Sequence, residues 1–200
     1  MSNNNINRKL YNAVYRNDVE KTKFYLNNGA NINWEDEWNW TPLTRAAYQG
    51  YDELVKLLAI KGADIDHNTS AINTPLTLAA TRGHVEVVKI LLSFGANIEN
   101  VVNTGVTALT LAAYWKHLEV VKVLLQKGAN INHRTHSGCT ALTLAASSHH
   151  RDVVKYLIFH GADVDITSST SGDTVLAMAA YFGDEELVEI LLSIGADVTK

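Results

Sequence analysis

The residues in this 200-residue sequence that are best suited to chemistry are histidines and a single cysteine. His133, His136 and Cys139 lie close together, His149 and His150 follow, and imidazole and thiolate groups are the usual ligands of zinc. The segment between the two groups reads as a helix, and about nine helical residues span roughly 13 Å. The first three residues alone lack a fourth ligand and lie in a predicted loop. We therefore expect no metal and no cofactor.

Motifs of catalytic sites are missing from the sequence. It contains no nucleophile elbow, no phosphate-binding glycine loop and no His-Glu-x-x-His pattern. Glu86 and Glu119 recur at one position of a repeating unit, each three residues before Lys89 or Lys122, a spacing that favours local ion pairs on a solvated helix face. A residue that recurs in this way is a poor candidate for a unique catalytic acid. We expect a protein that is not an enzyme.

The composition narrows the class of partner. With a net charge of -4, 46% hydrophobic and 19% charged residues, the sequence is typical of a globular protein. Its longest basic run is Arg8-Lys9, which argues against a nucleic-acid partner. The lone Cys139 and the absence of a signal-peptide pattern at the N-terminus lead us to expect an intracellular, cytoplasmic protein. No apolar run approaches the roughly 18 residues that span a bilayer, so we expect no membrane insertion.

An internal repeat of 33 residues organises the chain. Gly-Ala pairs begin at Gly29, Gly62, Gly95, Gly128, Gly161 and Gly195. Threonines with the same spacing are Thr41, Thr74, Thr107, Thr140 and Thr174. Both series lengthen by one residue in the last interval, so they mark one unit. We predict a single domain, 1–200, of six repeats at about 6–39, 40–72, 73–105, 106–138, 139–172 and 173–200.

Each unit reads as two helices and a projecting loop, as the third unit illustrates. Thr74 is a favourable N-cap, Pro75 is tolerated in the first helical turn, and the small pair Ala79-Ala80 lets neighbouring helices approach closely. A turn at Gly83 leads to a second helix with apolar residues at helical spacing, which ends at Gly95. A polar stretch of about a dozen residues, long enough for a hairpin, leads to the next threonine.

These units resemble the ankyrin repeat. The matching segments are Thr41-Pro42-Leu43-Thr44, Thr74-Pro75-Leu76-Thr77, Gly83-His84-Val85-Glu86-Val87-Val88 and the Gly-Ala-Asn/Asp-Ile/Val strings that end the repeats. The resemblance covers about residues 6–199. It implies an all-α repeat solenoid of helix-turn-helix units joined by projecting β-hairpin loops, and a module that binds protein through its concave face and hairpins.

The sequence departs from the family pattern at two kinds of position. The signature histidine is replaced at Thr44, Thr77, Thr110, Thr143 and Ala177. Threonine can hydrogen-bond locally, so we expect altered stability and an unchanged fold. Lys116 and His149 occupy turns that favour glycine, where a left-handed backbone would be strained. His84 and His117 fall where the family often has histidine, and we interpret both as structural.

The two ends of the array differ. In the first repeat Lys21 and Thr22 stand where later repeats have apolar residues, which predicts a polar cap facing water. The last repeat keeps apolar residues such as Leu187 and Ile190 and then ends at Lys200. We expect the natural chain to continue past this point, or the last repeat to pack against another subunit.

Aromatic residues recur where the repeat pattern tolerates any side chain, directly after the paired alanines. Tyrosine, tryptophan and arginine dominate binding hot spots. The predicted protein-binding residues are Trp34, Trp38, Trp40, Tyr48, Arg82, Tyr114, Trp115, Tyr181 and Phe182. For the three tryptophans, packing within or between repeats is an equally good interpretation.

The leading hypothesis is a non-enzymatic module that binds another protein or peptide. The alternatives are an N-terminal targeting domain of a larger enzyme or effector, and a homo-oligomer formed through the last repeat. The family resemblance adds that Asn33 and Asn132 correspond to positions that are hydroxylated in some animal ankyrin proteins.

Overall fold

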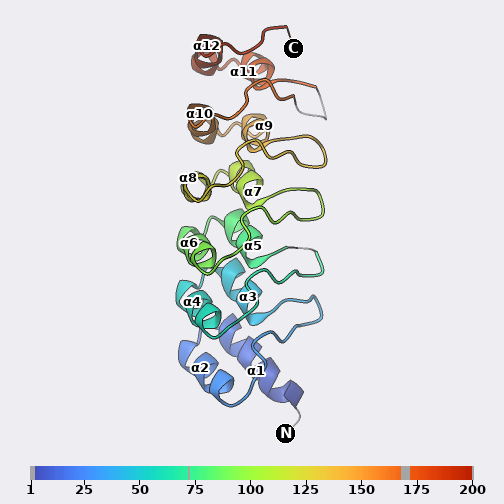
Figure 1. The fold of residues 1–200 in the computed structure, drawn as a ribbon, viewed down its shortest axis with the longest axis vertical. Coiled ribbons are helices and arrows are strands. Elements are labelled where there is room, and N and C mark those ends of the chain that lie inside the picture. The colour runs from blue at the N-terminus through green and yellow to red at the C-terminus, as the bar shows by residue number, and fades with distance from the viewer. Residues whose placement is uncertain (1–2, 72, 168–171, 200) are drawn as a thin grey trace.

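The computed structural model describes residues 3–71, 73–167 and 172–199, and this part of the chain contains twelve α-helices and no strand. The helices form six successive pairs that stack along one axis (Figure 1). The pairs are α1 (Asn3–Tyr15) with α2 (Val19–Asn27), α3 (Pro42–Gln49) with α4 (Asp52–Ile60), α5 (Pro75–Arg82) with α6 (Val85–Ser93), α7 (Ala108–Tyr114) with α8 (Leu118–Gln126), α9 (Ala141–Ser147) with α10 (Arg151–Phe159), and α11 (Val175–Tyr181) with α12 (Glu185–Ser193). The predicted all-α repeat solenoid is confirmed.

The helices form two columns. In Figure 1 the odd-numbered helices, here called the inner helices, stand beside five loops that point away from the even-numbered, or outer, helices. We call these loops fingers 1 to 5; they comprise residues 28–41, 61–74, 94–107, 127–140 and 160–174. In fingers 1 to 4, backbone hydrogen bonds across the loop close the expected hairpin without paired strands. In finger 2, for example, the N–H of Thr69 donates to the carbonyl of Asn73 at 3.0 Å.

Threonine pairs begin the inner helices α3, α5, α7 and α9. The hydroxyl of Thr74 accepts the N–H of Thr77 at 3.2 Å, and the hydroxyl of Thr77 accepts the N–H of Thr74 at 2.9 Å. The same reciprocal capping occurs at the start of α7 and α9. Both side chains are buried and fully satisfied locally, which confirms the expectation that threonine replaces the signature histidine without a change of fold.

The core lies between the two columns and runs the length of the stack. Its inner side consists of buried alanine pairs such as Ala46-Ala47, and its outer side of leucines and valines such as Leu54 and Val55. Histidines join successive repeats at the edge of this core. The Nε2 atoms of His84 and His117 each lie 3.0 Å from a backbone carbonyl of the preceding repeat, so the structural interpretation of both is confirmed.

Left-handed turns separate each inner helix from its outer partner. At Gly83, φ is 74°, and a Cβ atom would lie 2.5 Å from Nδ1 of His117. The corresponding turns after α7 and α9 hold Lys116 at φ 62° and His149 at φ 57°, as the sequence predicted. A left-handed backbone conformation costs a non-glycine residue such as Lys116 or His149 on the order of 1 kcal/mol.

The first repeat is only partly the polar cap that was expected. Lys21 is exposed, but Thr22 is fully buried, and its hydroxyl donates to the carbonyl of Asp18 at 2.8 Å. The prediction for Thr22 was wrong because threonine can satisfy its hydroxyl within its own helix and bury its methyl group. In the last repeat Leu187 is buried, whereas Leu192 is 48% exposed.

Candidate protein-binding surface

The residues predicted to bind a partner lie on finger 1 and at the C-terminal ends of the inner helices. Tyr48, Arg82, Tyr114 and Tyr181 are the last or next-to-last residues of their helices, and Trp115 and Phe182 follow directly. The most exposed are Tyr181 at 85%, Trp38 at 63%, Trp115 at 52%, Tyr114 at 43% and Phe182 at 41%. Arg82 is also exposed, and Trp34, Trp40 and Tyr48 are half-buried. The structure divides these residues into two groups with different surroundings.

The first group surrounds Arg45 on α3. Its guanidinium donates to the hydroxyl of Tyr11 from Nε at 3.0 Å and from Nη2 at 2.9 Å. The guanidinium also lies over the ring of Trp40, with 4.3 Å between Cζ and the ring centroid. A second aromatic contact joins Tyr11 to Trp34 edge-to-face at 5.6 Å. These contacts hold finger 1 against α1 and α3.

Asp36 completes the attachment of finger 1. Its Oδ2 accepts the hydroxyl of Tyr11 at 2.6 Å, and its Oδ1 accepts the backbone N–H groups of Trp38 and Trp40, each at 2.9 Å. Burial and the hydrogen bond to Asp36 raise the pKa of Tyr11 well above its usual range, and the nearby Arg45 offsets this in part. The carboxylate is therefore used within the molecule, and the finger has a fixed shape from which Trp38 projects.

A stacked pair extends this first group to the third repeat. The guanidinium of Arg82 lies over the ring of Tyr48, with 4.2 Å between Cζ and the ring centroid, and Nη2 of Arg82 donates to the hydroxyl of Tyr48. The Tyr48 ring also meets Trp40 edge-to-face at 5.2 Å. We call Tyr11, Trp34, Trp40, Arg45, Tyr48 and Arg82 the arginine–aromatic cluster.

The sequence pattern alone does not single out Arg45 or Tyr11. One signal was available, because Arg45 occupies the position that holds Leu78, Leu111 and Leu144 in the following three units. A charged residue at a position that is otherwise apolar indicates a specific contact within the molecule. That this contact is with Tyr11, 34 residues away, follows only from the packing of α1 against α3.

The second group consists of two exposed aromatic pairs. Tyr114 and Trp115 meet edge-to-face at 5.1 Å, and Tyr181 and Phe182 do the same at 5.0 Å. No arginine stacks on either pair in the described part of the chain. His149 lies beside Phe182, with 3.5 Å between the ring centroids. These rings hold one another in place and leave large apolar surfaces open to solvent.

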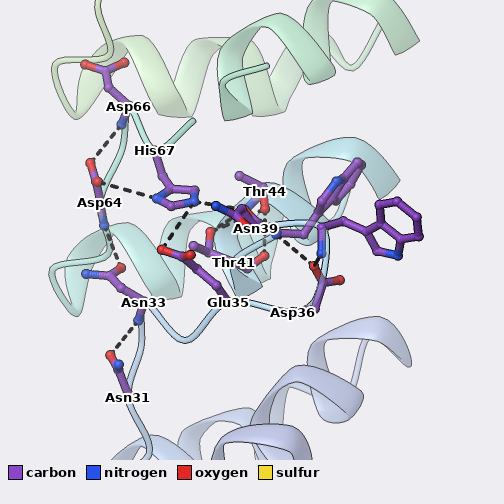
Figure 2. A network of polar contacts seen from close by, with 12 residues as sticks. Asn31, Asn33, Glu35, Asp36, Asn39, Thr41, Thr44, Asp64, Asp66 and His67 are labelled. Carbon is purple, nitrogen blue, oxygen red and sulfur yellow. Dashed lines mark hydrogen bonds and ion pairs between the residues drawn. The ribbon is translucent and has the colours of Figure 1, made fainter. Parts of the chain in front are cut away.

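A ladder of polar contacts fixes the spacing of the fingers. Figure 2 shows its first steps, in which the N–H of Asn33 donates to Oδ1 of Asn31, the N–H of Asp64 to Oδ1 of Asn33, and the N–H of Asp66 to Oδ1 of Asp64. Equivalent bonds continue to Asp197. Each finger is thus tied to the next through side-chain oxygens that accept backbone N–H groups.

Asn33 and Asn132, the two asparagines singled out for hydroxylation, are both members of this ladder. Oδ1 of each accepts the N–H of an aspartate in the next repeat at 2.9 Å. His67 adds a lateral contact visible in Figure 2, with Nε2 at 2.9 Å from the carbonyl of Asn39. The modification itself stays a prediction.

Two of the histidines considered as metal ligands, His133 and His150, contact the backbone of the preceding repeat. Nε2 of His133 lies 2.8 Å from the carbonyl of Gly105, and Nε2 of His150 lies 2.8 Å from that of Tyr114. Within residues 3–71, 73–167 and 172–199 there is no group of three or more histidine, cysteine or acidic side chains arranged to hold a metal ion. The arrangement offers rigid aromatic and cationic surfaces, which suit non-covalent recognition.

Comparison with known proteins agrees with the fold. A family model described as ankyrin repeats in three copies matches residues 2–69, 45–135 and 130–200, and these matches together span nearly the whole chain. No match to a curated protein was found. None of the helices in the described residues is both long and apolar enough to cross a membrane. The helix pairs, the threonine caps and the family match agree, and the chain belongs to the ankyrin-repeat family.

Proposed function

We propose that this chain is a non-catalytic module that binds a protein or peptide across the inner helices and the fingers. Ankyrin repeats are generally protein–protein interaction modules, and the family is typically non-enzymatic. The observation that carries the proposal here is the pair of exposed aromatic contacts on α7 and α11. They supply large apolar area at positions that face solvent.

Core packing gives no reason for aromatic side chains at these positions. The fifth repeat has Ser147 and Ser148 at the sites of Tyr114 and Trp115, and α9 packs in the stack as its neighbours do. Rings that are already held edge-to-face lose little rotamer entropy when a partner binds. Exposed, rigid aromatic rings of this kind support a recognition surface.

The test is affinity capture with the double variant Tyr114→Ala/Trp115→Ala. The variant should keep its thermal stability within about 1 kcal/mol of the original chain, since both rings are largely exposed, and should lose proteins that the original chain retains. Phe159→Ala is the matched control because Phe159 is 70% exposed on the outer helix α10. If the double variant and the control retained the same proteins, the aromatic pairs would not form the binding surface.

Self-association through the last repeat is a second candidate, favoured by apolar residues exposed there. Leu192 is 48% exposed, Ile194 49% and Val198 69%. Leu192→Glu should shift a dimer toward the monomer in sedimentation velocity and leave the core intact. Leu187 is unsuitable for this test because it is only 5% exposed. A sedimentation coefficient equal to that of a monomer for the unaltered chain at high concentration would eliminate this candidate.

A further inference from the structure

The inner helices of the third, fourth and fifth repeats and the turns and finger tips beside them contain no carboxylate. Residues 67–84, 100–117 and 131–150, which include α5, α7, α9 and the turns and finger tips beside them, have no aspartate or glutamate. We call these three segments the carboxylate-free surface. The whole chain carries a net charge of -4, so this surface differs in charge from the rest of the molecule.

Cations on this surface have no carboxylate partner among the described residues. Arg82, Lys116 and Arg134 are exposed, and none of them forms an ion pair among the described residues. Two exposed histidines, His136 and His149, lie on the same segments. The surface therefore presents positive charge that no carboxylate on these segments offsets.

Lysines on the outer helices α6, α8 and α10 of the same three repeats are arranged differently. Lys89 pairs with Glu86 at 2.7 Å, Lys122 pairs with Glu119 at 2.7 Å, and Lys155 pairs with Glu186 at 2.5 Å. Ion pairs of this kind lower the attraction of a surface for charged ligands. The contrast indicates that, within repeats three to five, an anionic group is attracted more strongly to the carboxylate-free surface than to the outer helices.

Acidic residues flank the carboxylate-free surface at both ends. Finger 1 carries the exposed residues Glu35 and Glu37, and α12 of the sixth repeat begins with the exposed residue Glu185. These carboxylates disfavour a negatively charged ligand at either end of the array. They limit the attractive region to the three central repeats.

Arg82 is the best-placed anchor for a carboxylate. Stacking on Tyr48 and one hydrogen bond to its hydroxyl hold the guanidinium in place, so less rotamer entropy is lost on binding. The hydrogen bond to Tyr48 uses one of the five N–H donors of Arg82, and the remaining fork suits a bidentate carboxylate. In the next repeat Tyr114 and Trp115 add apolar area beside this cation.

We infer that the carboxylate-free surface binds an acidic peptide segment that places a carboxylate on Arg82 and apolar side chains against Tyr114 and Trp115. The inference rests on the proposed function and adds the chemistry of the partner. A peptide fits better than a nucleic acid because three separate cations with acidic flanks do not form the continuous basic groove that follows a phosphate backbone.

The experiment is selection of binders to the full 200-residue chain from a random peptide library displayed on phage. The recovered peptides should be enriched in aspartate and glutamate together with apolar residues. A synthetic peptide of the recovered sequence should bind less tightly in fluorescence polarisation when sodium chloride rises from about 0.05 M to about 0.5 M, because screening shortens the reach of exposed charges.

Charge reversal at Arg82 tests the anchor. Arg82→Glu should weaken binding of the acidic peptide by about tenfold or more, and Arg82→Gln should weaken it less. Lys56→Glu, the same kind of charge change at an exposed residue of the outer helix α4, should leave the affinity unchanged. Thermal melting of each variant checks that it is folded. If Arg82→Glu does not fold, the affinity of Arg82→Gln decides the test.

The outcomes separate the inference from the proposed function. Recovery of neutral or basic peptides that no longer bind Tyr114→Ala/Trp115→Ala would contradict the inference of an acidic partner. The same result would support the proposed binding surface. An equal loss of peptide affinity in Lys56→Glu and Arg82→Glu would contradict the role of Arg82 as the carboxylate anchor. Displacement of the peptide by a short oligothymidylate would contradict the acidic peptide as the ligand and would favour nucleic acid. Failure to recover any binder would count against both proposals.

Discussion

The aromatic residues at the N-terminal end of this array and those toward its C-terminal end occupy equivalent repeat positions in different surroundings. Tyr48 is half-buried under Arg82 and against Trp40. Among the described residues the Tyr114 ring has a ring contact with its neighbour Trp115 alone, and Tyr114 is 43% exposed. The difference comes from the residues around the ring, since both rings follow a buried pair of alanines. A repeat position therefore provides a site for a side chain, and its neighbours decide whether that side chain stabilises the array or stays open to a partner.

Arg45→Ala should give the largest effect, because Arg45 joins three elements of the N-terminal region. Its loss removes two hydrogen bonds to Tyr11 and the stacking on Trp40, and we expect the free energy of unfolding to fall by about 2 kcal/mol in urea denaturation. Lys56→Ala, at an exposed residue of α4, is the control and should change stability by less than about 0.5 kcal/mol. Equal effects of the two variants would show that the contacts of Arg45 do not stabilise the N-terminal region.

Tyr11→Phe should lower stability by about 1–2 kcal/mol near neutral pH, because the hydroxyl that links Asp36 to Arg45 is lost. The raised pKa of Tyr11 in the folded chain means that the unfolded chain ionises first as the pH increases. The stabilisation from this hydroxyl is therefore complete below a pH of about 10, the ordinary tyrosine value, and is lost above it.

Urea denaturation of the original chain and of Tyr11→Phe at about pH 7 and about pH 11 measures this dependence. The difference between the two proteins should shrink at the higher pH. Tyr181→Phe, at an 85% exposed tyrosine of the C-terminal region, serves as the control. A difference for Tyr11→Phe that stays constant across this range would show that the hydroxyl contributes nothing through its protonation state.

Lys116→Gly should stabilise the chain by about 1 kcal/mol by removing left-handed strain from the turn after α7. The N-terminal region already has glycine in the equivalent turns, at Gly50 and Gly83. His149→Gly should gain less, since His149 also packs on Phe182. Differential scanning calorimetry measures both changes, and a lower melting temperature for Lys116→Gly would mean that the lysine makes a compensating contact.

The stacking of Arg82 on Tyr48 should give the smallest effect. A double-mutant cycle with Tyr48→Ala and Arg82→Ala should return a coupling free energy of about 0.5–1 kcal/mol, the range for a partly exposed cation–π pair. The same cycle with Arg82 and Tyr114 should return a value near zero. Similar coupling in the two cycles would mean that Arg82 interacts with both halves of the surface.

The fold was predictable because its signals are local and repeated. Threonine caps, alanine pairs and terminal glycines recur in the second to sixth units, and each acts within a few residues of its own position. Even the strained turns at Lys116 and His149 followed from their place in the unit. Thr22 was placed wrongly because the sequence does not show that its hydroxyl bonds within its own helix.

The candidate site was predictable only in part. Variable positions after the alanine pairs pointed to Tyr114 and Trp115, because exposure follows from the helical period. Trp34, Trp40, Tyr48 and Arg82 of the arginine–aromatic cluster were among the predicted residues, but Tyr11 and Arg45 were missed because their contact joins different repeats. Side-chain partners at such separation depend on rotamers and on the spacing of helices, which a single sequence does not encode in a readable pattern.

The polar ladder along the fingers has a direction. In every step between repeats the earlier repeat supplies the side-chain oxygen and the later one the backbone N–H, as in Asn33 with Asp64 and Asp165 with Asp197. Because this contact runs head to tail, each repeat offers its successor the same kind of contact, which we call a joint: a side-chain oxygen that accepts a backbone N–H. Gain or loss of one whole 33-residue unit by gene duplication or deletion would leave every remaining joint satisfied, which makes array length an easily inherited variable.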